Sequence, residues 1–371
     1  METQTSIWRN HLCDGVDFGV ESLKKSAGSE VTVAVVIPAY NAEGTLAETI
    51  SSVRNQTHRA LDIVVVDDGS KDDTLAIAQE IVEIDPRVRV LKQRNSGVAA
   101  ARNAGWRSTS ADLVAFLDAD DLWSPDKIER QLVALESGGP QVGLVYTWYA
   151  MIDHNNYVIY RSNEVSVEGD VLDDVLAQNF IGNGSSPLVR RTVLEATGGF
   201  DSSLQQRKAQ GCEDYLFYCL AAELSHFAVV PDHLVGYRQT PDNMSANLAR
   251  MLRSWILVAD EMLKRHPEKV LAIRAGLSRC GRWLAQRAVE QGQYRALIGL
   301  VATMSGYDKP IAAEMLVVDA RAKAMANLKK KARSWLRQEP NFSPNPNHRF
   351  ALGTKYDAGW TVDHPILVSA N

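Results

Sequence analysis

Short apolar segments alternate with helix-length amphipathic segments over the first third of the chain, and this alternation restricts the fold more than any other feature. Four apolar, largely β-branched runs are typical of buried strands: 31–37, 61–66, 88–91 and 113–117. The first three are each followed by apolar residues at helical spacing, at 43–57, 73–83 and 97–107. Strands separated by helices of this length favour parallel βαβ units in a doubly wound α/β sheet.

The second part of the chain has a different texture. After a helix at 125–136, the aromatic segments 142–149 and 157–161 flank a hairpin turn at 154–156, which predicts a mixed sheet. Further elements are expected as a helix at 171–178, a strand at 187–190, a helix from Glu213, and C-terminal helices from Leu248, near 267–291, at 293–304 and at 311–337. We therefore divide the chain into an extension (1–30), an α/β domain (31–245), a helical region (246–337) and an irregular tail (338–371).

Composition excludes several classes of protein. At 371 residues the chain is long enough for a full-sized domain and an appendage. A net charge of −5 with Lys and Arg spread along the chain predicts no nucleic-acid partner. The four cysteines form no CxxC pair, which is typical of reduced thiols in a cytoplasmic protein. No run of 18 apolar residues occurs, so we expect a soluble protein, with peripheral contact at the inner face of a membrane as the alternative.

Three carboxylates in four residues, Asp118, Asp120 and Asp121, follow the strand at 113–117. Buried strands of α/β proteins carry ligand sites just beyond their carboxyl ends. Such a cluster repels itself unless a cation or a hydrogen-bonded ligand neutralises it, and Mg²⁺ or Mn²⁺ favours oxygen ligands. The alternative is an acidic turn in which Asp121 or Ser124 caps a helix that begins at Pro125.

The turns after the first two strands offer further polar groups. Pro38–Glu43 (PAYNAE) lacks the glycines of a dinucleotide-binding turn or a P-loop, and by itself it fits a proline turn capped by Asn41. Asp67 and Asp68 end the second strand, where a carboxylate can accept hydrogen bonds from a base or a ribose. A helix cap by Ser70 or Asp72 would produce the same pattern.

Candidate residues also occur on three later segments. Arg102 and Asn103 stand in the small-residue helix that begins near Asn95 and Gly97, from which they could reach the ligand crevice; a surface salt bridge is the alternative for Arg102. Glu213 and Asp214 open an aromatic helix, where they either serve the site or stabilise the helix dipole. Arg238 could donate to a phosphate or belong to a polar linker. The glycine-rich loop that contains Ser185 is expected to border the acceptor, and a plain glycine-rich loop is the alternative.

In this order, the motifs PAYNAE, VVVDDGS, NSGVAAARNAG, FLDADD and GGF with a following ED resemble the inverting family 2 nucleotide-sugar glycosyltransferases of the GT-A fold. The resemblance covers about residues 31–245. It implies transfer of a sugar from a nucleotide donor with Mg²⁺ or Mn²⁺. By the same resemblance, Ala39, Tyr40 and Glu43 line the base and ribose pocket, Asp68 contacts the base, Asp118 the ribose and Asp120 the metal, and Asp214 is the general base. Thr240 stands where many relatives carry a histidine.

The hypothesis is therefore a metal-dependent, hexosyltransferase-like enzyme with a Rossmann-like GT-A domain followed by α-helices. The expected donor-binding set is Pro38, Ala39, Tyr40, Glu43, Asp67, Asp68, Asn95, Gly97, Arg102, Asp118 and Ala119. Asp120 is the expected metal ligand, Asp214 the catalytic base, and Glu213, Ser185 and Arg238 are the expected acceptor or phosphate contacts.

A UDP-sugar is the favoured donor, and the acceptor is a hydroxyl of a glycan or of a lipid-linked molecule, as in polysaccharide biosynthesis. The alternative function is a catalytically silent nucleotide-sugar or glycan binder with the same fold. The apolar stripe in 312–336, which runs beside basic residues, favours packing on the other C-terminal helices over membrane contact. A homo-oligomer formed through these helices is a further expectation.

Overall fold

The computed structural model describes residues 30–207, 209–239, 247–317 and 354–356. Its strands are β1 (Val33–Ala39), β2 (Leu61–Asp67), β3 (Val88–Lys92), β4 (Leu113–Phe116), β5 (Leu122–Trp123), β6 (Val142–Ile152), β7 (Val158–Arg161), β8 (Leu188–Arg190) and β9 (His226–Arg238). Its helices are α1 (Leu46–Arg54), α2 (Thr74–Ile84), α3 (Val98–Arg107), α4 (Lys127–Ser137), α5 (Leu172–Ala177), α6 (Arg191–Thr197), α7 (Ser203–Gln206), α8 (Glu213–Ala222), α9 (Leu248–Arg265), the 3₁₀ turn η3 (Pro267–Lys269), α10 (Val270–Glu290) and α11 (Tyr294–Tyr307).

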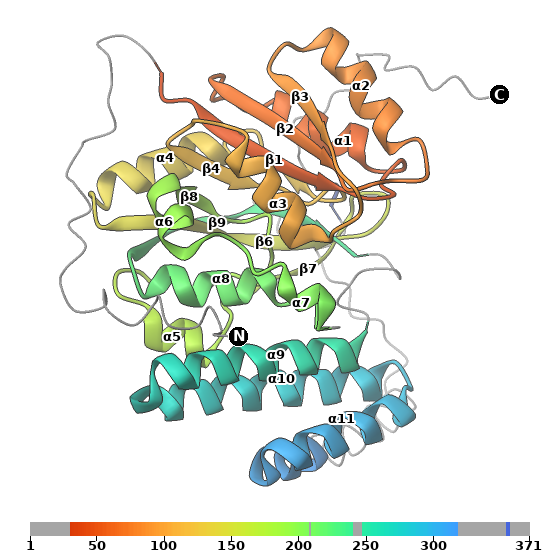
Figure 1. The fold of residues 1–371 in the computed structure, drawn as a ribbon, viewed down its shortest axis with the longest axis vertical. Helices are drawn as coiled ribbons and strands as arrows, with labels where there is room; N and C mark the ends of the chain where they lie inside the picture. The colour runs from red at the N-terminus through yellow and green to blue at the C-terminus, as the bar shows by residue number, and fades with distance from the viewer. Residues whose placement is uncertain (1–29, 208, 240–246, 318–353, 357–371) are drawn as a thin grey trace, which may run out of the picture.

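The described strands form one mixed sheet in the order β3-β2-β1-β4-β8-β6-β9-β5, with β7 paired to β6 (Figure 1). Strands β1 to β4 are parallel, and β8 pairs with β4 in the antiparallel sense. The four predicted parallel strands are confirmed, with ends within two residues of those expected. The predicted hairpin turn is confirmed as well, because Asp153 N donates to Tyr157 O between β6 and β7. Strands β5 and β9 and helices α6 and α7 were not predicted from the sequence.

Both faces of the sheet are buried, which explains the continuous apolar runs of its strands. Alternate residues of β1 enter different hydrophobic clusters: Val33, Val35 and Ile37 join one, and Ala34 and Val36 join the other. Helices α1, α2 and α4 cover the first face, whereas α3 and α8 cover the second. This arrangement is the doubly wound α/β architecture that the alternating pattern predicts.

The C-terminal helices continue the second hydrophobic cluster and do not form a core of their own. Helices α9 and α10 lie below α8 in Figure 1, with α11 beyond them. The rings of Tyr215 (α8) and Trp255 (α9) stack with their centroids 4.1 Å apart. Gly276 lets α10 approach α5 closely, because a Cβ there would lie 2.1 Å from Leu176 O. The second hydrophobic cluster is therefore continuous across the division that we placed at residue 245, which marks a change from α/β to helical sequence.

Several expectations lie wholly or partly outside the described residues. They are the extension 1–30, the predicted helix 311–337 beyond residue 317, and the tail 338–371 apart from 354–356. Among the helices that the structure describes, none combines the length and the apolar composition that crossing a membrane requires.

Candidate active site

The turns after β1 and β2 interlock at the carboxyl edge of the sheet. Asn41, whose φ of 50° is in the left-handed region, donates its N–H to Ser70 Oγ at 3.1 Å and accepts from Lys71 N at 2.9 Å. The Glu43 carboxylate accepts from Asp73 N at 3.0 Å. Asn41 therefore ties the two turns together, because both of these hydrogen bonds reach the turn after β2. Pro38 and Ala39 end β1, and the Tyr40 side chain that follows is 46 % exposed above them.

Asp68 organises the loop that leads into α3. Its buried carboxylate accepts hydrogen bonds from Gln93 Nε2 at 2.6 Å and from the backbone N–H groups of Ser96 and Gly97, both at 2.8 Å. Gly97 adopts a φ of 86°, which suits glycine. The expected contact of Asp68 with a base stays a prediction. Its hydrogen bonds to Ser96 and Gly97 place the exposed Asn95 and the half-buried Gly97 beside the turn that carries Asp68.

Asp67, the preceding carboxylate, is also buried. Its Oδ1 accepts from Ser70 N at 3.1 Å, whereas its Oδ2 has no hydrogen-bond partner in the described structure. Asp67 thus stabilises the DDGS turn through Ser70. The expected contact of Asp67 with a donor also stays a prediction.

Arg102 joins the end of β4 to the start of α8. Its side chain is 3 % exposed, which rules out the surface salt bridge. Nη2 donates to Asp118 Oδ1 at 2.6 Å, and Nη1 lies 3.9 Å from Glu213 Oε1. Gly184 makes this approach possible, because a Cβ there would lie 2.3 Å from Arg102 Nη2. One guanidinium therefore brings together carboxylates that are far apart in the sequence.

The three acids of the DADD segment occupy different environments. Asp121 is fully buried and accepts from Ser185 Oγ at 2.6 Å and from Arg238 N at 2.9 Å. Burial, together with Asp120 and Asp118, raises the pKa of Asp121 well above its usual range. Asp121 thus supports the turn from inside. Helix α4 begins at Lys127 with Asp126 at its N-cap position, so neither Asp121 nor Ser124 holds the capping position that the alternative gave them.

Asp118 and Asp120 remain as the carboxylates that could hold a cation. Burial and the charge of Asp118 raise the pKa of Asp120 to about 6. The positive charges of the protein therefore do not fully offset the negative charge of an ionised Asp120. The described residues contain no cluster of three or more His, Cys, Asp or Glu side chains suited to a metal. Mg²⁺ and Mn²⁺ sites with one or two carboxylates are completed by water and substrate phosphates. The donor set therefore fits a cation that binds together with a diphosphate.

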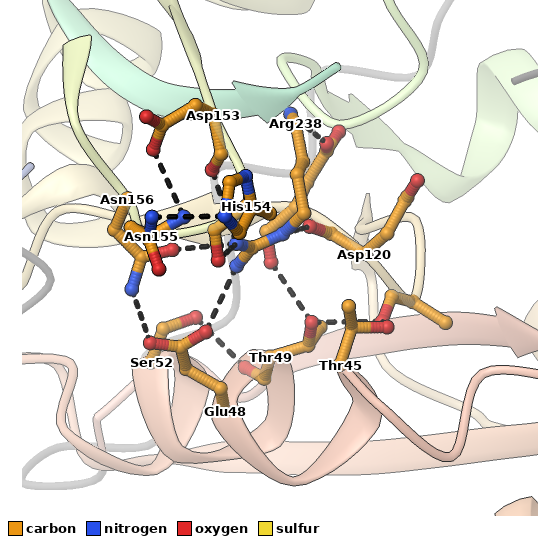
Figure 2. Close-up of polar contacts among 12 residues, drawn as sticks. Thr45, Glu48, Thr49, Ser52, Asp120, Asp153, His154, Asn155, Asn156 and Arg238 are labelled. Atoms are coloured by element: carbon orange, nitrogen blue, oxygen red, sulfur yellow. Dashed lines mark hydrogen bonds and ion pairs between the residues drawn. The ribbon is translucent and has the colours of Figure 1, made fainter. Parts of the chain in front are cut away.

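Arg238 supports the backbone of the acid turn. Its side chain is 2 % exposed. Figure 2 shows it between Glu48 of α1 and Asn156 of the β6–β7 hairpin. Nη2 donates to Glu48 Oε2 at 2.9 Å, Nη1 to Asn156 Oδ1 at 2.6 Å, and Nε to Asp120 O at 2.7 Å. Asn156 also donates to Glu48, which closes the network. This position favours a structural role over the phosphate or acceptor contact expected from the sequence.

Ser185 is likewise buried among protein groups. Its hydroxyl donates to Asp121 and accepts from Asp118 N at 3.0 Å, and its carbonyl accepts from Trp123 Nε1 at 2.9 Å. The expected acceptor or phosphate contact is not supported for this side chain. Ala119, which lies between the acids, contributes its carbonyl to Thr45 Oγ1 and Thr49 Oγ1, so α1 also holds the turn.

Glu213 and Asp214 occupy the first turn of α8, after Gly211 with a φ of 118°. The buried Glu213 carboxylate folds back to accept from Gly211 N at 2.7 Å. Asp214 is partly exposed and accepts from Tyr215 N at 2.7 Å. Burial and the charge of Glu213, opposed by Arg102, raise the pKa of Asp214 to about 7. Asp214 is therefore the carboxylate of this pair that is suited to exchange a proton near neutral pH.

Asn103 does not reach the crevice, contrary to expectation. It donates to Phe200 O at 2.7 Å and accepts from Phe200 N at 3.0 Å, which anchors the GGF segment to α3. Two residues of segments that the sequence singled out have roles that it did not predict. Gly184, in the loop that contains Ser185, leaves room for the Arg102 guanidinium. Tyr237, next to Arg238, is buried near Asp121 and Asp120, and burial and these charges raise its pKa.

Comparisons with known proteins show which sequences and folds this chain is similar to. Residues 34–196 match the family described as glycosyl transferase family 2. An uncharacterized glycosyltransferase of a Nostoc species is 33% identical over 215 residues, which cover 56% of this chain and 64% of that protein. Three Rickettsia glycosyltransferases are matched over only 30% or 31% of their lengths, so the chain spans less than two thirds of these curated relatives.

Solved structures show the same fold at low sequence identity. S. aureus TarS 1–349 in complex with UDP-GlcNAc has a TM-score of 0.60 and 15% identity, with 83% of this chain and 93% of that chain covered. The mannosyltransferase PcManGT of Pyrobaculum calidifontis, in complex with GDP-Man and Mn²⁺, has a TM-score of 0.52 and 20% identity, with 82% of each chain covered. The α/β core is thus a GT-A-type sheet followed by a helical region, and residues 34–196 are similar to glycosyl transferase family 2.

Proposed function

We propose that this protein transfers a sugar from a nucleotide-sugar donor to a hydroxyl group of an acceptor, with inversion at the transferred carbon. The observation that supports this most is the meeting of two kinds of carboxylate around Arg102. Asp118 comes from the nucleotide-binding edge of the sheet, and Glu213 with Asp214 comes from α8 on the other side. A displacement at an anomeric carbon needs a leaving group on one side and a base on the other.

Asp214 is the proposed general base. As the acceptor oxygen attacks, its bond to the anomeric carbon forms, the bond to the diphosphate oxygen breaks, and the hydroxyl proton passes to the Asp214 carboxylate. A pKa of about 7 matches this task, because a base is most effective when its pKa is near the working pH. Arg102 binds Asp118 and faces both acids of α8, so it fixes the position of Asp118 relative to Glu213 and Asp214.

Asp120, with Asp118 beside it, is the proposed ligand of Mg²⁺ or Mn²⁺. When bound, the cation would act as a Lewis acid that neutralises charge growing on the leaving diphosphate. Asp121, Ser185 and Arg238 hold the turn that presents these carboxylates.

The donor is proposed to be a UDP-sugar, with a GDP-sugar as the second choice. The structure of TarS is a complex with UDP-GlcNAc, and that of PcManGT is a complex with GDP-Man, which supports these two classes of donor. The acceptor is proposed to be a glycan or lipid-linked hydroxyl.

The test is a panel of UDP- and GDP-sugars incubated with the full chain and Mn²⁺, with release of the nucleoside diphosphate as the readout. We expect turnover with at least one donor and its loss with a chelator. NMR of the product should show the anomeric configuration opposite to that of the donor. A protein that neither binds nor turns over any donor in the panel would contradict the proposal, and retention of configuration would contradict the mechanism.

The cation assignment has a separate test. Calorimetry of UDP and GDP binding with and without Mn²⁺ should show a metal-dependent gain in affinity that Asp120→Asn abolishes. Unchanged metal-dependent affinity in this variant would remove Asp120 from the site.

A further inference from the structure

Residues 354–356 lie on the β6–β7 hairpin, far along the chain from the family 2 domain. Val158 N donates to Thr354 O at 2.9 Å, and Tyr356 N donates to Asn156 O at 2.7 Å. Between them, Lys355 forms an antiparallel bridge with Tyr157. The segment therefore pairs with the hairpin through its backbone, and the side chain of Lys355 remains exposed.

The side chain of Tyr356 is 4 % exposed and is buried against the α/β domain. Its ring completes a small hydrophobic cluster with Leu122, Ala150, Ile152 and Val158. The ring lies against β9 at Gly236, where a Cβ would come 3.0 Å from two of its carbons. The Tyr356 hydroxyl and Ser124 Oγ form a hydrogen bond of 3.2 Å.

The Tyr356 side chain and its backbone reach the acid turn by two routes. On one side, Leu122, a member of the hydrophobic cluster around Tyr356, directly follows Asp121. Ser124, which bonds to the Tyr356 hydroxyl, is two residues further on. On the other side, Asn156 accepts from Tyr356 N through its backbone and from Arg238 Nη1 through its side chain. Arg238 Nε in turn donates to Asp120 O. The segment 354–356 thus supports the network drawn in Figure 2 as well as the strand that leaves the turn.

We propose that Tyr356 is a positioning residue, through which the C-terminal segment sets the geometry of the Asp118–Asp121 turn. Its role is to keep β5 packed on β9, so that the turn between β4 and β5 holds Asp118 and Asp120 in one arrangement. The consequence for catalysis rests on the proposed function, whereas the consequence for the turn itself does not.

The experiment compares three variants of the full chain. Tyr356→Ala removes the ring, Tyr356→Phe retains the ring without the hydroxyl, and Lys355→Ala is a control in the same segment that leaves the backbone bridge intact. Hydrogen exchange is measured in peptides that cover 117–124, and affinity for UDP and GDP with Mn²⁺ is measured by calorimetry. Thermal unfolding is recorded in parallel, so that binding is compared well below each midpoint.

We expect Tyr356→Ala to speed exchange in 117–124, while exchange in β1 and β2 stays at the wild-type rate. Turnover should fall by about 10²-fold, since a displacement of about 1 Å can have an effect of that size. Tyr356→Phe should restore most of the protection and turnover, and Lys355→Ala should match the wild type. If Tyr356→Ala does not fold, Tyr356→Leu, which keeps part of the volume, takes its place in the same measurements.

Wild-type exchange at 117–124 in the folded Ala or Leu variant would overturn the proposal. Faster exchange that extends equally over β1 and β2 would also overturn it, because it would show general destabilisation. If the wild-type protein binds no nucleotide, the proposed function fails, but the exchange measurement still decides whether Tyr356 sets the turn.

Discussion

Replacing Arg102 by methionine should destabilise the fold and disturb the active site together. The change keeps a long apolar stem but removes the buried guanidinium that donates to Asp118 at 2.6 Å and faces Glu213 at 3.9 Å. Removing one partner of a buried ion pair leaves the other charge uncompensated and typically costs about 3–5 kcal/mol. Because Arg102 opposes the rise in the pKa of Asp214, the same change should move that pKa above 7.

The assay is urea unfolding at neutral pH, with Arg89→Met as the matched control. Arg89 pairs with Asp62 at 2.9 Å, but these side chains are 35% and 29% exposed, so the control should lose about 1 kcal/mol or less. The pH profile of turnover should also shift its rising limb to higher pH in Arg102→Met alone. A loss of stability no larger than that of the control, with an unshifted profile, would refute the role given to Arg102.

Three further predictions follow from the same geometry. Gly184→Ala should weaken nucleotide binding about tenfold or more, because its Cβ would lie 2.3 Å from Arg102 Nη2, whereas Gly299→Ala, in open space on α11, should bind normally; calorimetry compares them. In the wild type, kcat/KM should rise with pH through about 7 as Asp214 loses its proton, and a flat profile would argue against this base. Because the folded-state pKa of Asp214 is raised from 3.8, its contribution to stability should fall as pH increases from about 4 to 7. Asp214→Asn should therefore raise the free energy of unfolding at pH 8 by at most about 4 kcal/mol and by little at pH 4, as denaturant titrations can show.

The parallel half of the sheet could be predicted because its physics is local. Burial on both faces makes β1 and β4 continuous apolar runs, and β2 departs from this only at the half-buried Asp62 and at its last residue, Asp67. The intervening helices show their buried stripe at helical spacing. The carboxyl ends of parallel strands lie at one edge of the sheet, so the polar residues that follow these strands meet there whatever their individual contacts are. The carboxylates of the site could therefore be named in advance, although their individual partners could not.

The rest depends on contacts between distant parts of the chain. Nothing in DADD itself distinguishes Asp121, which bonds to Ser185 and Arg238, from Asp120, because that difference is set by loops 64 and 117 residues away. Arg238 shows the same limit, because it is the last residue of β9, a strand that the sequence did not predict, and it could have faced either a ligand or the core. The pairing of Tyr356 with Ser124 spans 232 residues, and the segment around Tyr356 has no periodic pattern that would indicate a docked strand.

The central claim is that Asp214 accepts the proton of the acceptor hydroxyl. The most direct measurement is the turnover of Asp214→Asn beside that of Glu213→Gln, with donor affinity measured for both. Loss of a positioned base typically lowers the rate by about 10² to 10⁴ while substrate binding survives. The account predicts a loss of that size for Asp214→Asn with nearly unchanged donor affinity, and a smaller loss for Glu213→Gln. Transfer by Asp214→Asn at close to the wild-type rate would contradict it.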